Sequence, residues 1–481
     1  MHFSGFCLSP SSPSFLFPSL RYRDSAFRVE ASCFCRSMLS MIPMIACLKI
    51  QRRKRRKKEM ARLIKLFAVR LVLIQILSSL RTRVKLHRAA IPAPSTAAIN
   101  TLLECEDDPS WISLLGFDRA AFSTLYEYFE PVFASLWRAQ VVRDRMKREG
   151  LDPRAAELDE DALANAAPSP RGKLGSLYNR MTGDCRRVLA LVLFHLTTFT
   201  QPKVSCMLFG VSPSSFSTYL DLGLRTLNSL LQLLPNAAVV WPKMEKQQEF
   251  AGMIRAKYPQ IAADFQPFGF VDGLNIEVKE SGDFYEQNAY YNGWLSGTFV
   301  SGIFVYGPDG TVIWARVNMP GSWHDSQCAR TLVEAIVETP NFIHEGFCIV
   351  GDTAFPRNAE TQGRIVTPKK QDEMDCLYRA RAPREEMVAM KILHRHATTV
   401  RQAAEWGMRQ IQSGFARLRV PLPLDKDERR LLLDTCVLLH NFRVRTVGLS
   451  QIRTVYSPIW QQCEYVRLEK PKKSRPADLF F

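Results

Sequence analysis

The sequence lacks the cysteine spacings that hold structural zinc. None of its twelve cysteines forms a C-x2-C pair, no C…H-x3-H pattern occurs, and Cys33 and Cys35 are too close for a zinc clip. A G-x-S-x-G motif and a P-loop are also absent, so neither a serine-nucleophile hydrolase nor a P-loop enzyme is supported. Because no clear secretory signal is present, we expect reduced, mostly buried thiols in an intracellular protein.

Net charge is almost absent from most of the chain. The formal charge is +17, but residues 1–90 hold 19 Lys/Arg and 3 Asp/Glu, which leaves only +1 for the other 391 residues. Overall charge therefore does not predict nucleic-acid binding by the body of the protein. The exception is QRRKRRKK, residues 51–58, which is typical of nuclear import or nucleic-acid contact, or of a solvated tail.

No uninterrupted apolar run is long enough to span a membrane, which takes about 20 residues. The nearest, LIKLFAVRLVLIQILSSL at residues 63–80, is broken by Lys65 and Arg70, and it predicts an amphipathic or buried helix. We therefore expect residues 1–99 to be a basic, largely disordered region ending in a linker. Met60 follows the basic run, so it stays open whether residues 1–59 belong to the working protein.

Apolar residues at helical spacing dominate residues 100–245 and predict an all-helical domain. Within it, residues 187–230 have the pattern of a helix-turn-helix. Pro202 fits the start of a helix, Gly210 fits its end, and a serine two or four residues later fits the next N-cap. The last helix has few base-reading side chains, so DNA contact and a plain structural bundle both remain open.

Short runs rich in Val, Ile and Phe replace the helical pattern after residue 262. FGFVDGLNIEV, TFVSGIFVYG and TVIWARVNM predict strands, and Gly307–Gly310 predicts a hairpin turn between the last two. A helix, the strand in FCIVGD and further helices follow. The fold class is therefore α/β, with a mixed sheet flanked by helices over 262–447, after the helical domain and before a C-terminal tail at 448–481.

Three carboxylates occupy positions where catalytic or metal-binding residues are expected. Asp272 interrupts a strand, although strands disfavour Asp. Asp352 ends a strand, where ligands of α/β sheets gather, and Glu405 lies on a later helix. Each also has an ordinary interpretation, namely an Asp-Gly strand end, an Asx-turn, and an ion pair with Arg401 or Arg409.

Taken together, the three acids predict a metal site. Carboxylates without Cys or His select a hard ion, Mg²⁺ or Mn²⁺. Without a metal the acids would repel one another and their pKa values would rise. Two ions roughly 3.5–4 Å apart would relieve that repulsion and set up phosphodiester cleavage, by activating the attacking water or 3′-hydroxyl and stabilising the leaving oxygen.

The segments VDGLNIEV, YNGW, NMPGSWHDSQ, IVGDTAFP and LLLDTCVLLHNFR resemble the DDE-type endonuclease domain of PIF/Harbinger transposases and the nucleases derived from them. The resemblance covers about residues 180–445 and is most specific in GSWHDS and GDTAFP. It implies an RNase H-like fold with Asp272 as the first acid and Asp352 as the second, after a helix-turn-helix-like region. Family members often rely on a Myb-like partner for DNA targeting and nuclear entry.

The third acid departs from the family pattern. Many members carry it in E-R-x-F-G-x-L-K, and alignment on Gly414–Leu418 places Gln412 there. Glu405 lies seven residues earlier on nearly the same helix face, and we assign it as the third catalytic and metal-binding acid. Asp325, in GSWHDS, matches another family position and is either a further metal ligand or a helix N-cap. Its neighbour His324 is expected to be structural.

Two functions follow. The first is a divalent-metal-dependent DNA endonuclease of transposase origin in the nucleus, with DNA, a Myb-like protein and a second copy of the chain as partners and no membrane. The alternative is a domesticated, catalytically inactive DNA- or protein-binding module on the same fold. Asp272 and Asp352 favour the first, and Gln412 favours the second.

Overall fold

The described part of the chain falls into two units, Met1–Lys85 and Leu86–Phe481. The computed structural model describes residues 28–81, 86, 88–148, 185–260, 265–355, 361–381 and 383–457.

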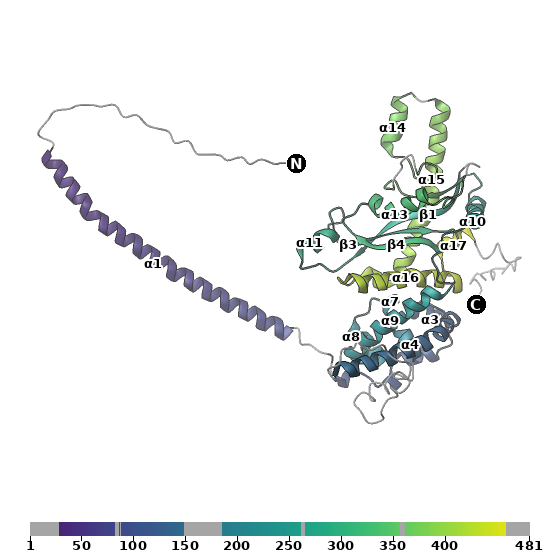
Figure 1. The fold of residues 1–481 in the computed structure, drawn as a ribbon, viewed down its shortest axis with the longest axis horizontal. Helices are drawn as coiled ribbons and strands as arrows, with labels where there is room; N and C mark the ends of the chain where they lie inside the picture. The colour runs from purple at the N-terminus through teal and green to yellow at the C-terminus, as the bar shows by residue number, and fades with distance from the viewer. Residues whose placement is uncertain are drawn as a thin grey trace, which may run out of the picture. The chain divides into compact units, whose positions relative to one another are not determined.

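The described residues of the first unit form the helix α1 (Arg28–Arg81), of 54 residues (Figure 1). This helix lies within the region 1–99 that was expected to be largely disordered, and residues 1–27 lie outside the described residues. Residues 44–81 contain no Pro or Gly and are rich in Leu, Arg and Lys, which are good helix formers. The apolar side chains from Leu63 to Ile74 are exposed, so this stretch is helical but not buried. No helix among the described residues is long and apolar enough to cross a membrane.

The second unit begins with a helical domain (Figure 1). Trp111 and Phe122 meet edge to face with ring centroids 5.0 Å apart in its core. A Cβ on Gly223 would lie 2.7 Å from Val192, so the two helices that carry them pack closely. The domain comprises η1 (Arg88–Ala90), η2 (Pro94–Thr96), α2 (Ile99–Glu104), α3 (Asp108–Leu115), α4 (Arg119–Arg148), α7 (Cys185–Thr197), α8 (Pro202–Phe209) and α9 (Pro213–Leu233).

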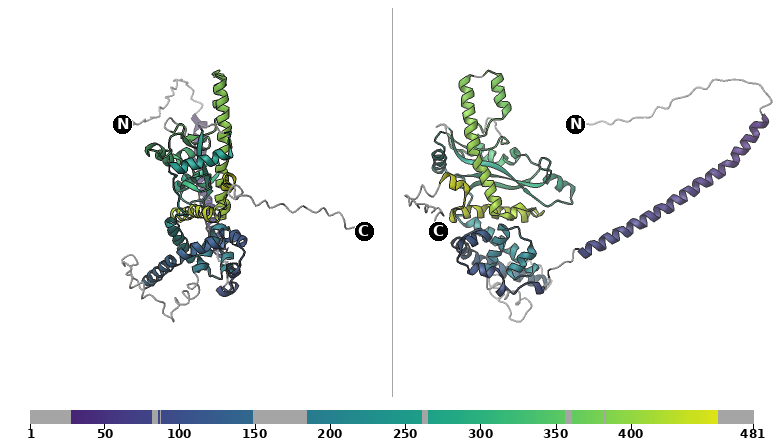
Figure 2. Two further views of the ribbon diagram at one scale, coloured as in Figure 1. Left: turned by 90° about the vertical axis from the view of Figure 1, so that its right-hand side faces the viewer. Right: turned by 180° about the vertical axis from the view of Figure 1, so that it is seen from behind.

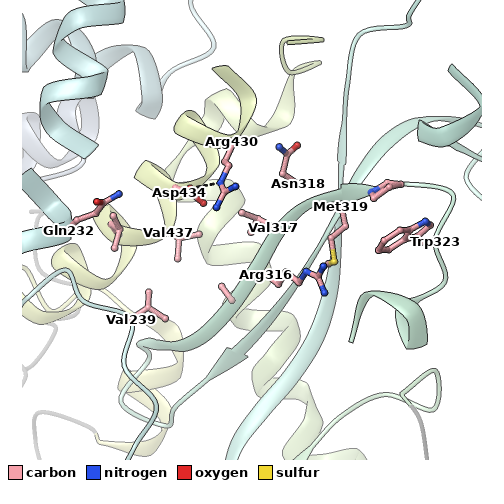
Figure 3. Close-up of a pocket in the computed structure, with 13 residues that line it drawn as sticks. Gln232, Val239, Arg316, Val317, Asn318, Met319, Trp323, Arg430, Asp434 and Val437 are labelled. Carbon is pink, nitrogen blue, oxygen red and sulfur yellow. Dashed lines mark hydrogen bonds and ion pairs between the residues drawn. The ribbon is translucent and has the colours of Figure 1, made fainter. Parts of the chain in front are cut away.

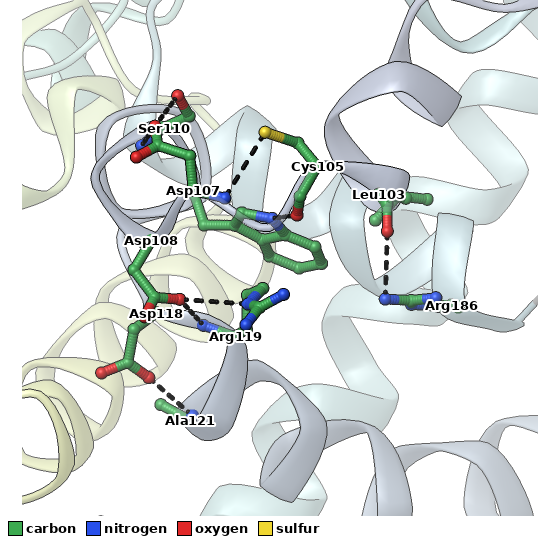
Figure 4. A network of polar contacts seen from close by, with 10 residues as sticks. Leu103, Cys105, Asp107, Asp108, Ser110, Asp118, Arg119, Ala121 and Arg186 are labelled. Atoms are coloured by element: carbon green, nitrogen blue, oxygen red, sulfur yellow. Dashed lines mark hydrogen bonds and ion pairs between the residues drawn. The ribbon is translucent and has the colours of Figure 1, made fainter.

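Polar contacts hold the turns between the first of these helices (Figure 4). Asp107 caps α3 by accepting the Ser110 N–H, and the Trp111 indole donates to the Cys105 carbonyl over 2.9 Å. The Asp108 carboxylate accepts the Arg119 N–H at the start of α4. These bonds satisfy helix-terminal N–H groups that the helices leave free.

The helix boundaries expected in 187–230 are confirmed. Gly210 ends α8 in the left-handed conformation at φ 67°, and the Ser212 side chain caps α9 by accepting the Ser215 N–H. Glycine suits this position because it carries no Cβ to strain a positive φ. DNA contact by this segment stays a prediction.

The predicted mixed sheet is confirmed. Its order is β4–β3–β1–β5–β6, with β2 beside the start of β3. Strand β3 is antiparallel to β1 and β4, whereas β1, β5 and β6 run parallel. The expected turn joins β3 to β4 through Gly307 and Gly310. The strands are β1 (Gln266–Glu277), β2 (Tyr291–Asn292), β3 (Gly297–Tyr306), β4 (Val312–Pro320), β5 (Phe347–Val350) and β6 (Ile365–Val366).

Helices cover both faces of the sheet (Figures 1 and 2). Phe268 and Val271 of β1 pack into one apolar cluster with α10 (Met244–Lys257) and α13 (Arg330–Glu338). On the other side, Phe270 packs into the cluster that contains residues of α15 and α17. These elements and their neighbours are α11 (Phe284–Tyr290), α12 (Asp325–Cys328), α14 (Gln371–Arg379), α15 (Arg384–Gly414), η3 (Ala416–Arg419), α16 (Lys426–Thr446) and α17 (Gln451–Tyr456).

Helix α16 joins the sheet to the helical domain. Asn441 accepts the Val312 N–H over 2.7 Å and donates to the Val312 carbonyl over 2.8 Å, which covers the open edge at the start of β4. On another face of α16, Asn228 of α9 donates to the Thr435 hydroxyl over 3.1 Å. The two predicted domains therefore share α16 as a packing surface.

Helix α17 lies inside the segment 448–481 that was expected to be a tail. Ile452 and Tyr456 are buried, and Tyr456 stacks on Phe270 of β1 at 5.3 Å between ring centroids. This part of the segment therefore completes the core, and residues 458–481 lie outside the described residues. The described cysteines are free, and five of the eight are buried, as the sequence predicts.

Candidate active site

Asp272 and Asp352 lie on adjacent parallel strands. Phe270 of β1 is in register with Val350 of β5, and each aspartate stands two residues beyond its member of that pair. Neighbouring strands are about 4.8 Å apart, so this register brings the two carboxylates to one place at the sheet. Asp272 Oδ1 accepts the Gly273 N–H over 2.8 Å, which orients its carboxylate.

Asp325 approaches β1 from the loop after β4. It is the first residue of α12, and a Cβ built on Gly273 would lie 2.9 Å from its Oδ1 atom. Only a glycine at 273 leaves room for the Asp325 carboxylate beside the strand that carries Asp272. The charges of Asp325 and Asp352 both raise the pKa of Asp272, so the three carboxylates lie within electrostatic reach of one another.

The electrostatics of these acids show mutual repulsion. Burial raises the pKa of Asp272 to about 6; the Gly273 N–H and Arg401 oppose this rise, and Asp352 and Asp325 add to it. Burial likewise raises the pKa of Asp325, which His324 lowers and Asp352 raises further. Charged carboxylates gathered out of water favour a nearby cation.

Glu405 comes from α15, which packs on the sheet through small side chains. Ala403, Ala404 and Gly407 are buried, and a Cβ on Gly407 would lie 2.7 Å from the Tyr306 ring. Glu405 itself is on the exposed side, and its side chain keeps 49% of its accessible surface. The buried small residues set how near α15, and with it Glu405, comes to β1.

Arg401 links Glu405 to the strand acids. Its Nη2 atom donates to Glu405 Oε1 over 2.9 Å, and its Nη1 atom lies 3.9 Å from Asp352 Oδ1. The i, i+4 spacing made Arg401 one of two ion-pair partners expected for Glu405. Its approach to Asp352 is a long-range contact that no local pattern indicates. Gln412 is half-buried, two helical turns beyond Glu405.

The donor set fits a divalent ion in kind. Aspartate and glutamate oxygens are the ligands that Mg²⁺ and Mn²⁺ prefer. The pKa of Asp272 is raised first by burial, and then by the charges of Asp352 and Asp325. Within the described ranges, no group of three or more His, Cys, Asp or Glu side chains is arranged tightly enough to hold a metal ion. Arg401 supplies the positive charge between Asp352 and Glu405.

The alternative that Asp325 is a helix N-cap is wrong, because His324 caps α12. His324 Nδ1 accepts the Ser326 N–H, and the Gln327 side chain accepts the His324 N–H, which completes a capping box. This structural role agrees with the expectation for His324. The Asp325 carboxylate therefore does not cap α12, and it lies next to Gly273.

A separate cavity of about 660 Å³ lies between β4, α16 and the end of α9 (Figure 3). Trp323 lines one end, and the Arg430–Asp434 ion pair, 3.4 Å long, lines another part. None of the four predicted acids lines it. The cavity is therefore distinct from the carboxylate site.

Comparison with known proteins supports a nuclease. Residues 271–441 match a family described as DDE superfamily endonuclease. This range is about a third of the chain and begins one residue before Asp272. It contains Asp272, Asp325, Asp352 and Glu405. No curated protein and no solved structure matches the chain.

Proposed function

From the similarity of residues 271–441 to DDE superfamily endonucleases, we propose that the chain is a divalent-metal-dependent DNA endonuclease of transposase origin. The observation that supports the proposal is the electrostatic coupling of Asp272, Asp325 and Asp352, which come from a strand, a helix start and the end of a neighbouring strand. Acids at such positions have no shared packing role that would bring them together. Their repulsion makes the site costly unless a cation offsets it.

Each acid has a role in the proposal. Asp272 and Asp352 would hold Mg²⁺ or Mn²⁺, with Glu405 as the third ligand and Asp325 as a further one. A bound divalent ion would supply Lewis-acid stabilisation of the phosphodiester and a more acidic water. The Gly273 N–H keeps Asp272 oriented, and burial of Asp272 keeps bulk water from one side of the site.

The finer assignments belong to the same proposal. The sheet order, with the antiparallel pairs β4–β3 and β3–β1 followed by the parallel strands β5 and β6, supports an RNase H-like fold. The GSWHDS and GDTAFP motifs, which carry Asp325 and Asp352, support the PIF/Harbinger subtype. We further propose nuclear localisation through the basic run at 51–58, and a Myb-like protein and a second copy of the chain as partners.

The experiment is a nicking assay on supercoiled plasmid DNA with Mg²⁺ or Mn²⁺. The wild type should nick the plasmid, and Asp272→Asn and Asp352→Asn should each lose more activity than the roughly 10–100-fold typical of outer-shell changes. Asp434→Asn, in the separate cavity, is the matched control and should keep full activity. Unchanged nicking by either site variant contradicts the mechanism.

A second candidate is an inactive DNA- or protein-binding module on the same fold. The ion pairs of Arg401 with Asp352 and Glu405 favour it, because they neutralise two of the acids without a metal. DNA binding by a wild type that never nicks DNA would select this candidate. Comparing Glu405→Gln with Gln412→Ala in the same assay identifies the third acid.

A further inference from the structure

Helices α14 and α15 form a hairpin that extends away from the sheet (Figures 1 and 2). The first fully buried side chain of α15 is Ala397, and within residues 384–396 the partly buried Leu393 packs against the edge of the core. Lys391 lies over the Tyr378 ring at 5.1 Å and ties the two helices together. Apart from Leu393, core packing therefore does not account for this half of α15.

Acidic residues are absent from residues 387–404, which contain Lys391, Arg395 and Arg401. Four exposed polar side chains of this stretch follow the i, i+4, i+7, i+11 spacing of a single helix stripe, and we call them the donor row: Lys391, Arg395, Thr398 and Gln402. The Thr398 hydroxyl donates to the His394 carbonyl over 2.8 Å, so the donors offered to a ligand are those of Lys391, Arg395 and Gln402.

The donor row runs from the hairpin to the candidate active site. Eleven residues of helix cover about 16 Å at 1.5 Å per residue. The row ends at Gln402, next to Arg401, which contacts Asp352, and one turn before Glu405. Consecutive base pairs of a duplex rise by about 3.4 Å, so the row matches the length of several nucleotides.

We infer that the donor row binds the phosphate backbone of DNA next to the position that is cut. This inference rests on the proposed function for the choice of DNA as the occupant, and on charge complementarity for the surface. Lysine, arginine, hydroxyl and amide donors are the groups that contact phosphates without reading sequence. The row therefore positions the DNA strand, and base recognition comes from elsewhere.

The test measures binding without catalysis. Fluorescence anisotropy of a labelled 30-base-pair duplex in EDTA compares the full-length wild type with the double variant Lys391→Ala/Arg395→Ala. We expect affinity to fall about 3–30-fold, and the slope of log affinity against log salt to shrink by about two, since each lost phosphate contact removes about 0.9. Alanine favours helix, so α15 should be retained, and circular dichroism checks this.

The matched control is Lys246→Ala/Lys257→Ala, which removes two charges from exposed positions on α10. This variant should bind like the wild type. Equal losses in both double variants, or unchanged affinity in the α15 variant, overturn the inference. If the wild type leaves the plasmid intact in the nicking assay, the proposed endonuclease activity is refuted. The anisotropy result still holds in that case, because the anisotropy assay contains no metal and measures binding alone. An α15 variant with unchanged DNA affinity would instead point to a protein partner for the hairpin.

Discussion

Arg401 and Glu405 form an ion pair one turn apart on α15, with Nη2 and Oε1 separated by 2.9 Å, and the same guanidinium lies 3.9 Å from Asp352. A lysine or arginine at this position competes with any other cation for the two carboxylates. Arg401 keeps 23% of its side-chain surface, so it is more enclosed than either acid. The pair therefore gives a direct way to probe the candidate site.

Replacing Arg401 with Gln should raise the affinity for Mn²⁺ by about 3–10-fold, because it removes a like charge from the position of the metal. Isothermal titration calorimetry measures this without activity. Arg401→Lys keeps the charge and should stay close to the wild type, as should Arg409→Gln, an exposed arginine two turns further along α15. Weaker Mn²⁺ binding by Arg401→Gln would show that Arg401 supports the metal site.

Arg429 should be essential for stability. It is fully buried and has no carboxylate partner; it bonds to Asn318, to the Pro423 and Leu424 carbonyls and to the Tyr290 hydroxyl. Arg429→Met leaves these buried groups without their hydrogen-bond partner. It should lower the free energy of unfolding, measured by chemical denaturation, by about 3–5 kcal/mol. Arg429→Lys should not rescue it, since an ammonium lacks the planar fork.

The control for this variant is the next residue. Arg430→Met removes an arginine whose side chain is 74% exposed and which pairs with Asp434 on the surface. Exposed pairs contribute about 0–1 kcal/mol, so its loss should be small. Equal destabilisation by the two methionine variants would contradict the assigned role of Arg429.

Two helical glycines should respond in opposite directions to alanine. A Cβ on Gly407 would lie 2.7 Å from the Tyr306 ring, whereas nothing lies within 4 Å of one on Gly252 of α10. Gly407→Ala should lower the free energy of unfolding by about 1–3 kcal/mol through overpacking between α15 and the sheet. Gly252→Ala should raise it by up to about 1 kcal/mol through helix propensity. Thermal denaturation of both variants tests the close packing of α15.

Acid should destabilise the fold through two buried histidines. The pKa of His440 is lowered to about 4, mainly by burial. The nearby charges of Arg443 and Arg445 also lower this pKa, and the hydrogen bond to the Gly310 carbonyl opposes the shift. Burial and then Arg417 lower the pKa of His195 to about 4 as well. Below the ordinary histidine pKa of about 6.5 the unfolded chain binds protons that the folded chain does not bind.

Stability is therefore complete above about pH 6.5 and is lost as the pH falls toward 4, by up to about 1.4 kcal/mol per pH unit for each histidine. Denaturant titrations at pH 7, 6 and 5 measure this slope. His440→Gln keeps a donor for the Gly310 carbonyl. This variant should reduce the slope of the free energy of unfolding against pH by the contribution of one histidine. Identical slopes in the wild type and this variant would show that His440 does not titrate on unfolding.

Local sequence signals predicted much of the fold. Short runs rich in Val, Ile and Phe indicated β1, β3, β4 and β5, and Gly210 and the serine at 212 marked the helix boundaries that the structure has. These features depend on residues within a few positions of one another. The capping residue of α12 was missed because histidine is an uncommon N-cap beside Asp and Ser. The helix α17 was missed because its burial depends on distant Phe270.

The sequence alone determined which residues are acidic, which ends of strands carry them, and that the body of the chain is nearly neutral. Only the tertiary structure decided that Asp325 lies against Gly273, that Arg401 stands between Asp352 and Glu405, and that half of α15 carries its donor row outside the core. The physical reason is that strand register and close packing through Gly273 and Gly407 set distances between residues far apart in the chain. Charge and periodicity in the sequence carry no such distances.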